Sequence, residues 1–182
     1  MDDRDRLLSM LVAASRRGEF VLSSGKKSDF YIDGKQVTLT GEGLSLSARL
    51  LYPRIVAAGA GAVGGPSTGA DPIVGALGVH SWREGSPLAL FYVRKEPKGH
   101  GAGRRIEGPP LAATARVALV EDVVTTGASL VRAIDAVRST YGSIVVRTFC
   151  LVDREEGGGD ALAAAGVPLE AIFRRAEILA RL

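Results

Sequence analysis

The sequence has few of the residues that build disulfides, metal sites or membrane spans. Cysteine occurs once in 182 residues, as Cys150 in the apolar run VVRTFCLV. A lone cysteine cannot close an internal disulfide, so we expect a reducing, cytoplasmic location. The two histidines, His80 and His100, have no second His or Cys at ligand spacing, which argues against a histidine or cysteine metal site. No apolar run is long enough to cross a membrane, and the acidic N-terminus is unlike a signal peptide.

Aromatic residues are also scarce, at 5%, so the core must be built mainly from Ala, Val, Leu and Ile. The net charge of +3 would suit nucleic acid, but the positive residues do not form a stripe with interleaved aromatics. They gather instead between residues 94 and 105 and in the C-terminal segment. A compact basic loop suits a polyphosphate ligand, and we expect neither a nucleic acid nor a membrane as partner.

Hydrophobic periodicity predicts strands and helices that alternate along most of the chain. The predicted helices cover residues 3–16, 41–58, 71–82, 127–141, 160–165 and 174–182. A hairpin is predicted over 20–33, with Ser24 and Gly25 in its turn, and single strands over 62–65, 87–93, 117–123, 143–153 and 168–173. Thr40 is the expected N-cap of the second helix.

Near-continuous apolar strands separated by helices are typical of a parallel sheet covered on both faces. We therefore predict an α/β fold with an open, mainly parallel sheet flanked by helices, and a small N-terminal hairpin as a cap. One domain should span residues 1–182, with cap elements over about 1–40. Residues 94–110 have no hydrophobic period, and a loop of this length in a small domain is usually a functional lid or disordered.

The strongest chemical signal is VALVEDVVTTGAS, residues 117–129, in which an apolar strand ends in Glu121 and Asp122. Ligands of open α/β sheets bind beyond the carboxyl ends of the strands. The small-residue turn that follows offers N–H groups, hydroxyls and a helix dipole to a phosphate monoester, while the acids suit a ribose diol. A divalent cation nearby would reduce the repulsion between acids and phosphate. The alternative is a simple N-cap by Thr125 or Thr126 with stray acids.

The segment RKEPKGHGAGRRIEGPP, residues 94–110, supplies the cations Arg94, Lys95, Lys98 and His100. Cations gathered in one loop would suit a polyphosphate ligand. Glycines would let the loop move, and its closure would exclude water. The alternative is an ordinary solvated basic loop.

Residues 117–129 resemble the signature of type I phosphoribosyltransferases at all thirteen positions, and residues 95–101 are similar to the mobile loop of the orotate branch. FVLSSGKKSDFYID (20–33) resembles the N-terminal hairpin of that branch. GGPSTGADP (64–72) resembles its Gly-rich loop, whose backbone approaches the pyrophosphate. The resemblance implies transfer of a phosphoribosyl group from 5-phosphoribosyl 1-pyrophosphate (PRPP) to orotate, which gives orotidine 5′-phosphate and pyrophosphate in pyrimidine biosynthesis.

The resemblance also implies roles for individual residues. Glu121 and Asp122 would hold the ribose hydroxyls. Lys98 and His100 would stabilise or protonate the leaving pyrophosphate. The implied catalytic residues are Lys98, His100 and Asp122. The implied PRPP-binding set is Arg94, Lys95, Lys98, His100, Glu121, Asp122, Val123, Val124, Thr125, Thr126, Gly127, Ala128 and Ser129. The implied orotate-binding set is Thr125, Arg154, Lys27, Phe30 and Tyr31.

Mg²⁺ is implied as a cofactor held mainly by the substrate, with Asp122 in reach through water and no direct protein ligand. In this family the loop reaches the active site of the neighbouring subunit, which implies a homodimer. Ser23 and Gly69 depart from well-known members of the family, which carry Lys at the first position and Tyr-Lys across residues 68 and 69. Two alternatives remain: a type I enzyme that uses a purine or uracil, and a non-catalytic regulator on the same fold that binds nucleic acid.

Overall fold

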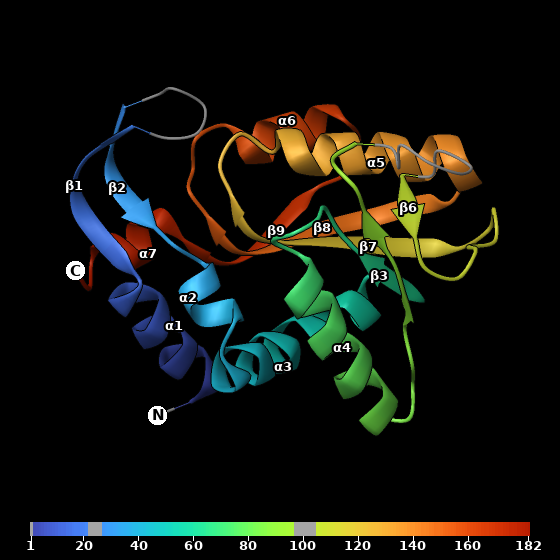
Figure 1. The fold of residues 1–182 in the computed structure, drawn as a ribbon, viewed down its shortest axis with the longest axis horizontal. Coiled ribbons are helices and arrows are strands. Elements are labelled where there is room, and N and C mark those ends of the chain that lie inside the picture. The colour runs from blue at the N-terminus through green and yellow to red at the C-terminus, as the bar shows by residue number, and fades with distance from the viewer. Residues whose placement is uncertain (1, 22–26, 97–104) are drawn as a thin grey trace.

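The computed structural model describes residues 2–21, 27–96 and 105–182. Its central sheet has five parallel strands in the order β4-β3-β7-β8-β9 (Figure 1). The strands are β3 (Ala62–Gly64), β4 (Ala89–Leu90), β7 (Arg116–Val124), β8 (Ile144–Asp153) and β9 (Leu169–Arg174). The predicted α/β fold with an open, mainly parallel sheet is therefore confirmed.

Helices cover both faces of this sheet. On one face lie α1 (Asp3–Ala13), α3 (Gly41–Ala57) and α4 (Asp71–Arg83), and on the other lie α5 (Ala128–Tyr141) and α6 (Gly158–Ala164) (Figure 1). Two hydrophobic cores result, a first core between the sheet and α1, α3 and α4, and a second core between the sheet and α5 and α6. Successive residues of a strand point to opposite faces, so Ala118 and Val120 of β7 lie in the first core, while Val117 and Leu119 lie in the second. Burial on both faces explains why β7 reads as a continuous apolar run.

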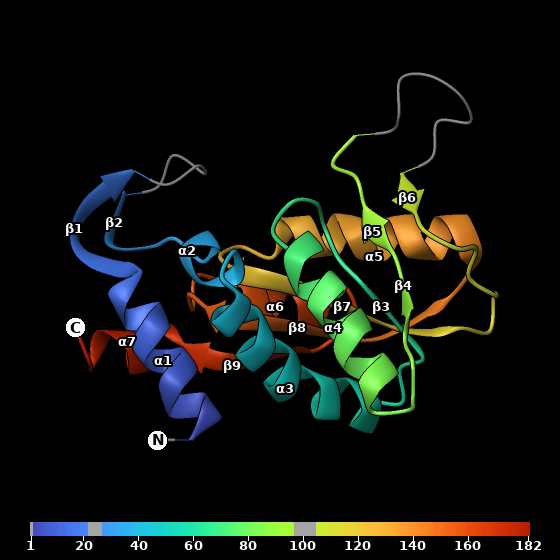
Figure 2. The ribbon, with the colours of Figure 1, turned by 60° about the horizontal axis from the view of Figure 1, so that its bottom comes forward.

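The N-terminal hairpin consists of β1 (Ser15–Val21) and β2 (Lys27–Ile32), which pair antiparallel. Figures 1 and 2 place it at one end of the molecule, beside α1 and α7 (Arg175–Leu179). It starts earlier than predicted because the first helix stops at Ala13, where the Ser15 hydroxyl donates to the Leu11 carbonyl. The predicted turn residues Ser24 and Gly25 lie outside the described residues. Helix α1 packs Leu7, Leu8 and Leu11 into the first core.

The strand predicted over 87–93 runs beside β3 over residues 89–93, since the Phe91 N–H donates to the Val63 carbonyl at 3.1 Å and the Val93 N–H donates to the Gly65 carbonyl at 2.8 Å. Strand β4 pairs parallel with β3, and β5 (Tyr92–Val93) in addition pairs antiparallel with β6 (Ile106–Glu107) in a short ribbon that was not predicted (Figure 2). The run is apolar throughout because Phe91 and Val93 are buried in the second core. Gly64 makes room for the Phe91 side chain, since a Cβ there would lie 2.5 Å from the Phe91 ring.

The ribbon also shortens the predicted loop over 94–110. The Arg94 N–H donates to the Arg105 carbonyl at 2.8 Å, and Ile106 is buried, so both ends of the segment are fixed to the body. A short helix, α2 (Lys35–Thr38), was also not predicted. Thr40 caps α3 as expected, accepting from the Gly43 N–H at 3.0 Å. In the part of the chain that the structure describes, no helix is long and apolar enough to cross a membrane.

Candidate active site

The strand order locates the candidate site. After β3 the chain forms β4 on one side of it and then crosses to form β7 on the other side. Such a reversal opens a crevice beyond the carboxyl ends of the two strands, which is where α/β proteins bind ligands. Glu121 and Asp122 lie near the carboxyl end of β7, and the loop at residues 65–70 follows β3. The topology thus brings together two segments that the sequence singled out.

Glu121 is held by the helix that follows it. The Ser129 hydroxyl lies 2.7 Å from each carboxylate oxygen of Glu121 and can donate to either. Burial raises the pKa of Glu121 to about 7, and Asp122 adds to the rise, while the Ser129 hydrogen bond and the charges of Arg132 and Lys35 oppose it. Near neutral pH this carboxyl group is therefore divided between its neutral and its charged form.

Asp122 is 8% exposed and lies between two glycines. A Cβ at Gly69 would lie 2.5 Å from Oδ1 of Asp122, and one at Gly34 would lie 2.9 Å from Oδ2. These close approaches need residues without side chains. Gly69, where well-known members of the family carry Lys, is therefore explained by the position of Asp122, which leaves no room for a side chain at residue 69.

The turn after β7 leaves the start of α5 open. Its N-cap is Gly127, with φ 74°, and no side chain caps the helix. Thr125 and Thr126 therefore do not act as the simple cap that was the alternative interpretation. The unpaired N–H groups and the dipole of the first turn form a suitable seat for a phosphate.

The predicted phosphate residues differ in what they can offer. The Val124 side chain is buried, so this residue can contribute only its backbone, and its carbonyl already accepts from the Arg154 N–H at 2.9 Å. The Ser129 hydroxyl is bonded to Glu121, so a phosphate would have to compete for it. Val123, Thr125, Thr126 and Ala128 are partly or fully exposed at the same edge.

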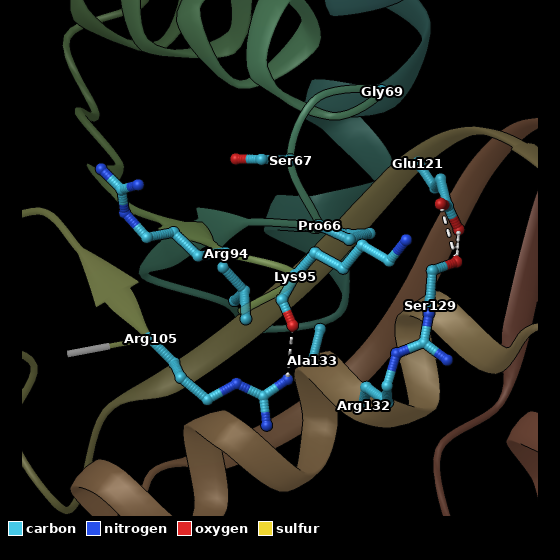
Figure 3. Close-up of a pocket in the computed structure, with 11 residues that line it drawn as sticks. Pro66, Ser67, Gly69, Arg94, Lys95, Arg105, Glu121, Ser129, Arg132 and Ala133 are labelled. Carbon is cyan, nitrogen blue, oxygen red and sulfur yellow. Dashed lines mark hydrogen bonds between the residues drawn. The ribbon is translucent and has the colours of Figure 1, made fainter. Parts of the chain in front are cut away.

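A cavity of about 190 Å³ opens beside these residues (Figure 3). Four cations line it, namely Arg94, Lys95, Arg105 and Arg132, together with the carboxyl group of Glu121. The remaining lining residues are Pro66, Ser67, Gly69, Val93, Ser129 and Ala133. Arg94 is paired with Glu107 at 2.9 Å, and the other cations face the cavity without an ion pair among the described residues. This excess of positive charge suits a polyanion.

Two of these cations, Arg105 and Arg132, were not predicted to be site residues. Arg132 could have been found from its spacing, since it lies three residues after Ser129 on the same face of a helix. Arg105 faces the cavity only because the β5–β6 ribbon folds back, and nothing in the sequence indicated that ribbon.

The residues that were expected to bind the base lie at the hairpin and at the end of β8. Two of them, Arg154 and Phe30, are hydrogen-bonded to each other. Arg154 is 4% exposed. Its Nε donates to Glu156 at 3.0 Å, and its Nη2 donates to the Ser28 hydroxyl at 3.0 Å and to the Phe30 carbonyl at 2.7 Å. In the ligand-free chain Arg154 therefore joins the hairpin to β8.

The two aromatic residues differ in exposure. The Phe30 ring is fully buried, so it cannot cover a ligand, and only the backbone of Phe30 can contribute to a site. Tyr31 is 41% exposed and stacks on Phe20 with ring centres 5.4 Å apart. Lys27 is the first residue of β2, while Lys98, His100 and Ser23 lie outside the described residues.

No family model matches the chain, but comparison with curated proteins is decisive. The chain is 46% identical over 166 residues to an orotate phosphoribosyltransferase from Bradyrhizobium diazoefficiens, covering 90% of this chain and 88% of the relative. The chain belongs to the orotate phosphoribosyltransferase family. The family predicted from the motif at 117–129 and the loop at 95–101 is thus confirmed.

Solved structures of orotate phosphoribosyltransferases share the fold. The enzyme from Aeropyrum pernix is 37% identical, with a TM-score of 0.80 and coverage of 96% of this chain and 97% of that one. The Mycobacterium tuberculosis enzyme in complex with PRPP is 30% identical, with a TM-score of 0.79 and coverage of 97% and 99%.

Proposed function

We propose that this chain transfers a phosphoribosyl group from PRPP to N1 of orotate, giving orotidine 5′-phosphate and pyrophosphate. The observation that carries the proposal is the arrangement at the end of β7. Two adjacent carboxylates lie between the uncapped start of α5 and a cavity lined by four cations. A diol-binding pair, a phosphate seat and a polyanion cavity are the three parts that PRPP requires.

The described residues divide the donor between them. The 5-phosphate is bound by the N–H groups at the start of α5, with Thr125 and Thr126 adding hydroxyls. The ribose hydroxyls donate to Glu121 and Asp122, and the pyrophosphate enters the cationic cavity. Because negative charge grows on the pyrophosphate as the glycosidic bond breaks, these cations stabilise the transition state more than the ground state. In this proposal Lys98 and His100 supply further charge or a proton to the leaving group.

Orotate lies at the hairpin end in the proposal, bound by Thr125, Arg154, Lys27, Tyr31 and the backbone of Phe30. A guanidinium group suits the orotate carboxylate. Since Nε and Nη2 of Arg154 are already bonded to protein groups, Nη1 is the nitrogen left for the base. The contacts that hold the hairpin thus also fix the direction in which this guanidinium points.

Mg²⁺ is the proposed cofactor, carried by the pyrophosphate of the donor. Among the described residues no group of three or more His, Cys, Asp or Glu side chains could hold a metal ion, and the acids at the end of β7 are the pair Glu121 and Asp122. This donor set fits an ion that keeps several waters and binds mainly to substrate oxygens, with Asp122 reached through water. When bound, Mg²⁺ would neutralise part of the charge on the pyrophosphate.

We also propose a homodimer with shared sites and a cytoplasmic location. Val79 and Trp82 lie three residues apart on α4 and are both exposed, and their burial against a second subunit would be favourable. The single thiol, Cys150, is buried and free, which suits a reducing compartment.

An acceptor panel tests the proposed function. The purified protein is mixed with PRPP and Mg²⁺, and orotate, uracil, hypoxanthine or adenine is added in turn while the ultraviolet absorbance of each base is followed. We expect only orotate to be consumed. Consumption of a purine or of uracil instead would replace the proposed acceptor. Binding of RNA or DNA without turnover of any base would favour the regulator.

A further inference from the structure

Arg132 is a charged side chain of the cavity for which the sequence predicted no role. It lies in the second turn of α5, and Figure 3 shows its guanidinium group beside Ser129 at the wall of the cavity. Its charge acts on the neighbouring carboxyl group, since it lowers the pKa of Glu121 against the effect of burial. Among the described residues no acid forms an ion pair with it, in contrast to Arg94, which is paired with Glu107. Arg132 therefore has charge available for a ligand.

A second cation approaches the same cavity from the β5–β6 ribbon. One terminal nitrogen of Arg105 donates weakly to the Lys95 carbonyl at 3.5 Å (Figure 3). Its Nε is buried, and within the described ranges it has no hydrogen-bond partner. A buried donor without a partner costs free energy, so a ligand oxygen at this place would be favourable. Arg105 and Arg132 reach the cavity from different elements, the ribbon and the helix.

The size and charge of the cavity select the ligand class. At about 190 Å³ it has room for several water-sized groups. Four cations against one carboxyl group, itself partly neutral near pH 7, leave an excess of positive charge. Guanidinium groups bind phosphate oxygens with two parallel N–H donors, which favours a compact phosphate polyanion over a carboxylate base.

We propose that Arg132 binds the pyrophosphate group of the phosphoribosyl donor, with Arg105 contacting the same group from the ribbon. The proposal rests on the proposed function, because it takes PRPP as the donor. It adds two arginines to the cations of the loop. Arg132 is part of a helix that packs into the second core, so its backbone is held at the wall of the cavity.

The test compares Arg132→Met and Arg132→Lys with Arg138→Met. The control removes the same charge from the same helix, where Arg138 donates to the Ala165 carbonyl away from the cavity. Calorimetric titration with inorganic pyrophosphate and Mg²⁺ measures binding directly, and steady-state kinetics give KM for each substrate. Thermal melting checks that every variant is folded.

We expect Arg132→Met to weaken pyrophosphate binding and to raise KM for PRPP by about tenfold or more, with KM for orotate within about twofold. Arg132→Lys should recover part of the loss, because it keeps the charge without the planar fork. Arg138→Met should match the wild type. Unchanged pyrophosphate affinity in Arg132→Met, or an equal rise in KM for orotate, would overturn the proposal. If the wild type bound pyrophosphate without consuming orotate, the proposed acceptor would fail, while the titrations would still decide the role of Arg132.

Discussion

At the scale of single residues, the carboxyl group of Glu121 connects the electrostatics of the site to its ligand. Burial raises its pKa from 4.5 to about 7, so the folded chain favours the neutral form more than the unfolded chain does. This contribution to stability is complete below the unfolded pKa and is lost as the pH rises through about 7. Ribose hydroxyls, by contrast, donate best to the charged form.

The first prediction follows from these opposite preferences. Between pH 5 and 8 the free energy of unfolding of the ligand-free wild type should fall by up to about 3 kcal/mol more than that of Glu121→Gln. PRPP affinity of the wild type should fall as the pH drops from 7 to 6, whereas Glu121→Gln should lack that part of the slope. Urea unfolding and titration calorimetry measure the two quantities. Parallel pH profiles for both proteins would show that Glu121 does not titrate in this range.

The second prediction separates the two roles of Arg154. Arg154→Ala should weaken orotate binding by about 2–3 kcal/mol and leave PRPP binding nearly unchanged, because it removes the guanidinium proposed for the orotate carboxylate. It should also lower the melting temperature, since Arg154 bonds the hairpin through Ser28 and Phe30.

Ser28→Ala is the matched control for this prediction. It removes the hydroxyl that Nη2 contacts at 3.0 Å but keeps the guanidinium, so it should lower stability while changing KM for orotate much less. If both variants raised KM for orotate equally, Arg154 would be a positioning residue for the hairpin and not an orotate ligand.

The sequence singled out Glu121, Asp122, the turn that follows them and Arg154 as site candidates, because each lies in a local pattern at the end of an apolar strand. It could not show that Ser129 bonds to Glu121 or that Arg154 bonds to the hairpin. Arg154 and Ser28 are 126 positions apart in the sequence, and the contact between Ser129 and Glu121 depends on how α5 packs against β7. The buried ring of Phe30 was missed for a similar reason, since the alternation along β2 does not say which face α1 and α7 will cover.

At the scale of elements, predictions were best where burial produced a regular pattern. The bounds of α5, β7 and β8 were predicted to within one residue. The helix buries one apolar stripe, and the two strands are buried on both faces, so each leaves a clear pattern in the sequence. The run at 87–93 follows β3 as a strand should, but apolar periodicity reports burial and not pairing partners. The second pairing, of Tyr92 and Val93 with β6, involves residues more than ten positions away and was therefore missed.

The third prediction concerns the two ends of α5. Gly127 and Gly142 both have positive φ, 74° and 68°, so alanine should strain the backbone similarly at each. A Cβ at Gly127 would also lie 3.0 Å from the Gly158 carbonyl oxygen, whereas at Gly142 the nearest atom is 3.9 Å away. Gly127→Ala should therefore cost about 1–2 kcal/mol of stability and raise KM for PRPP, because it disturbs the phosphate seat. Gly142→Ala should lose about 1 kcal/mol and keep KM for PRPP.

Chemical denaturation and steady-state kinetics measure both variants of this pair. Equal KM values for PRPP in Gly127→Ala and the wild type would remove the start of α5 from the phosphate site.

At the scale of the whole molecule, the proposed dimer assigns the active site to two chains. In the proposal Lys98 and His100 act on the neighbouring subunit, while Asp122 acts on its own. The fourth prediction uses Lys98→Ala and Asp122→Asn, each nearly inactive as a pure dimer. In a mixed dimer one active site contains both substitutions and the other contains neither. Refolding the two variants together should therefore restore part of the activity.

Different affinity tags on the two variants, with recovery of both tags in one purified species, offer an independent measure of subunit exchange. With exchange established, complete absence of recovered activity would show that Lys98 acts within its own subunit.

The most direct test of the central claim is to follow the phosphorus atoms of PRPP by ³¹P nuclear magnetic resonance. The protein is incubated with PRPP and Mg²⁺, first without and then with orotate. For the wild type we predict that PRPP persists until orotate is added and is then converted into equal amounts of pyrophosphate and orotidine 5′-phosphate. Asp122→Asn, folded by thermal melting, should lose most of this conversion, because Asp122 faces the ribose in the proposal. Persistence of PRPP in the presence of orotate and wild-type protein, or full conversion by Asp122→Asn, would contradict the account.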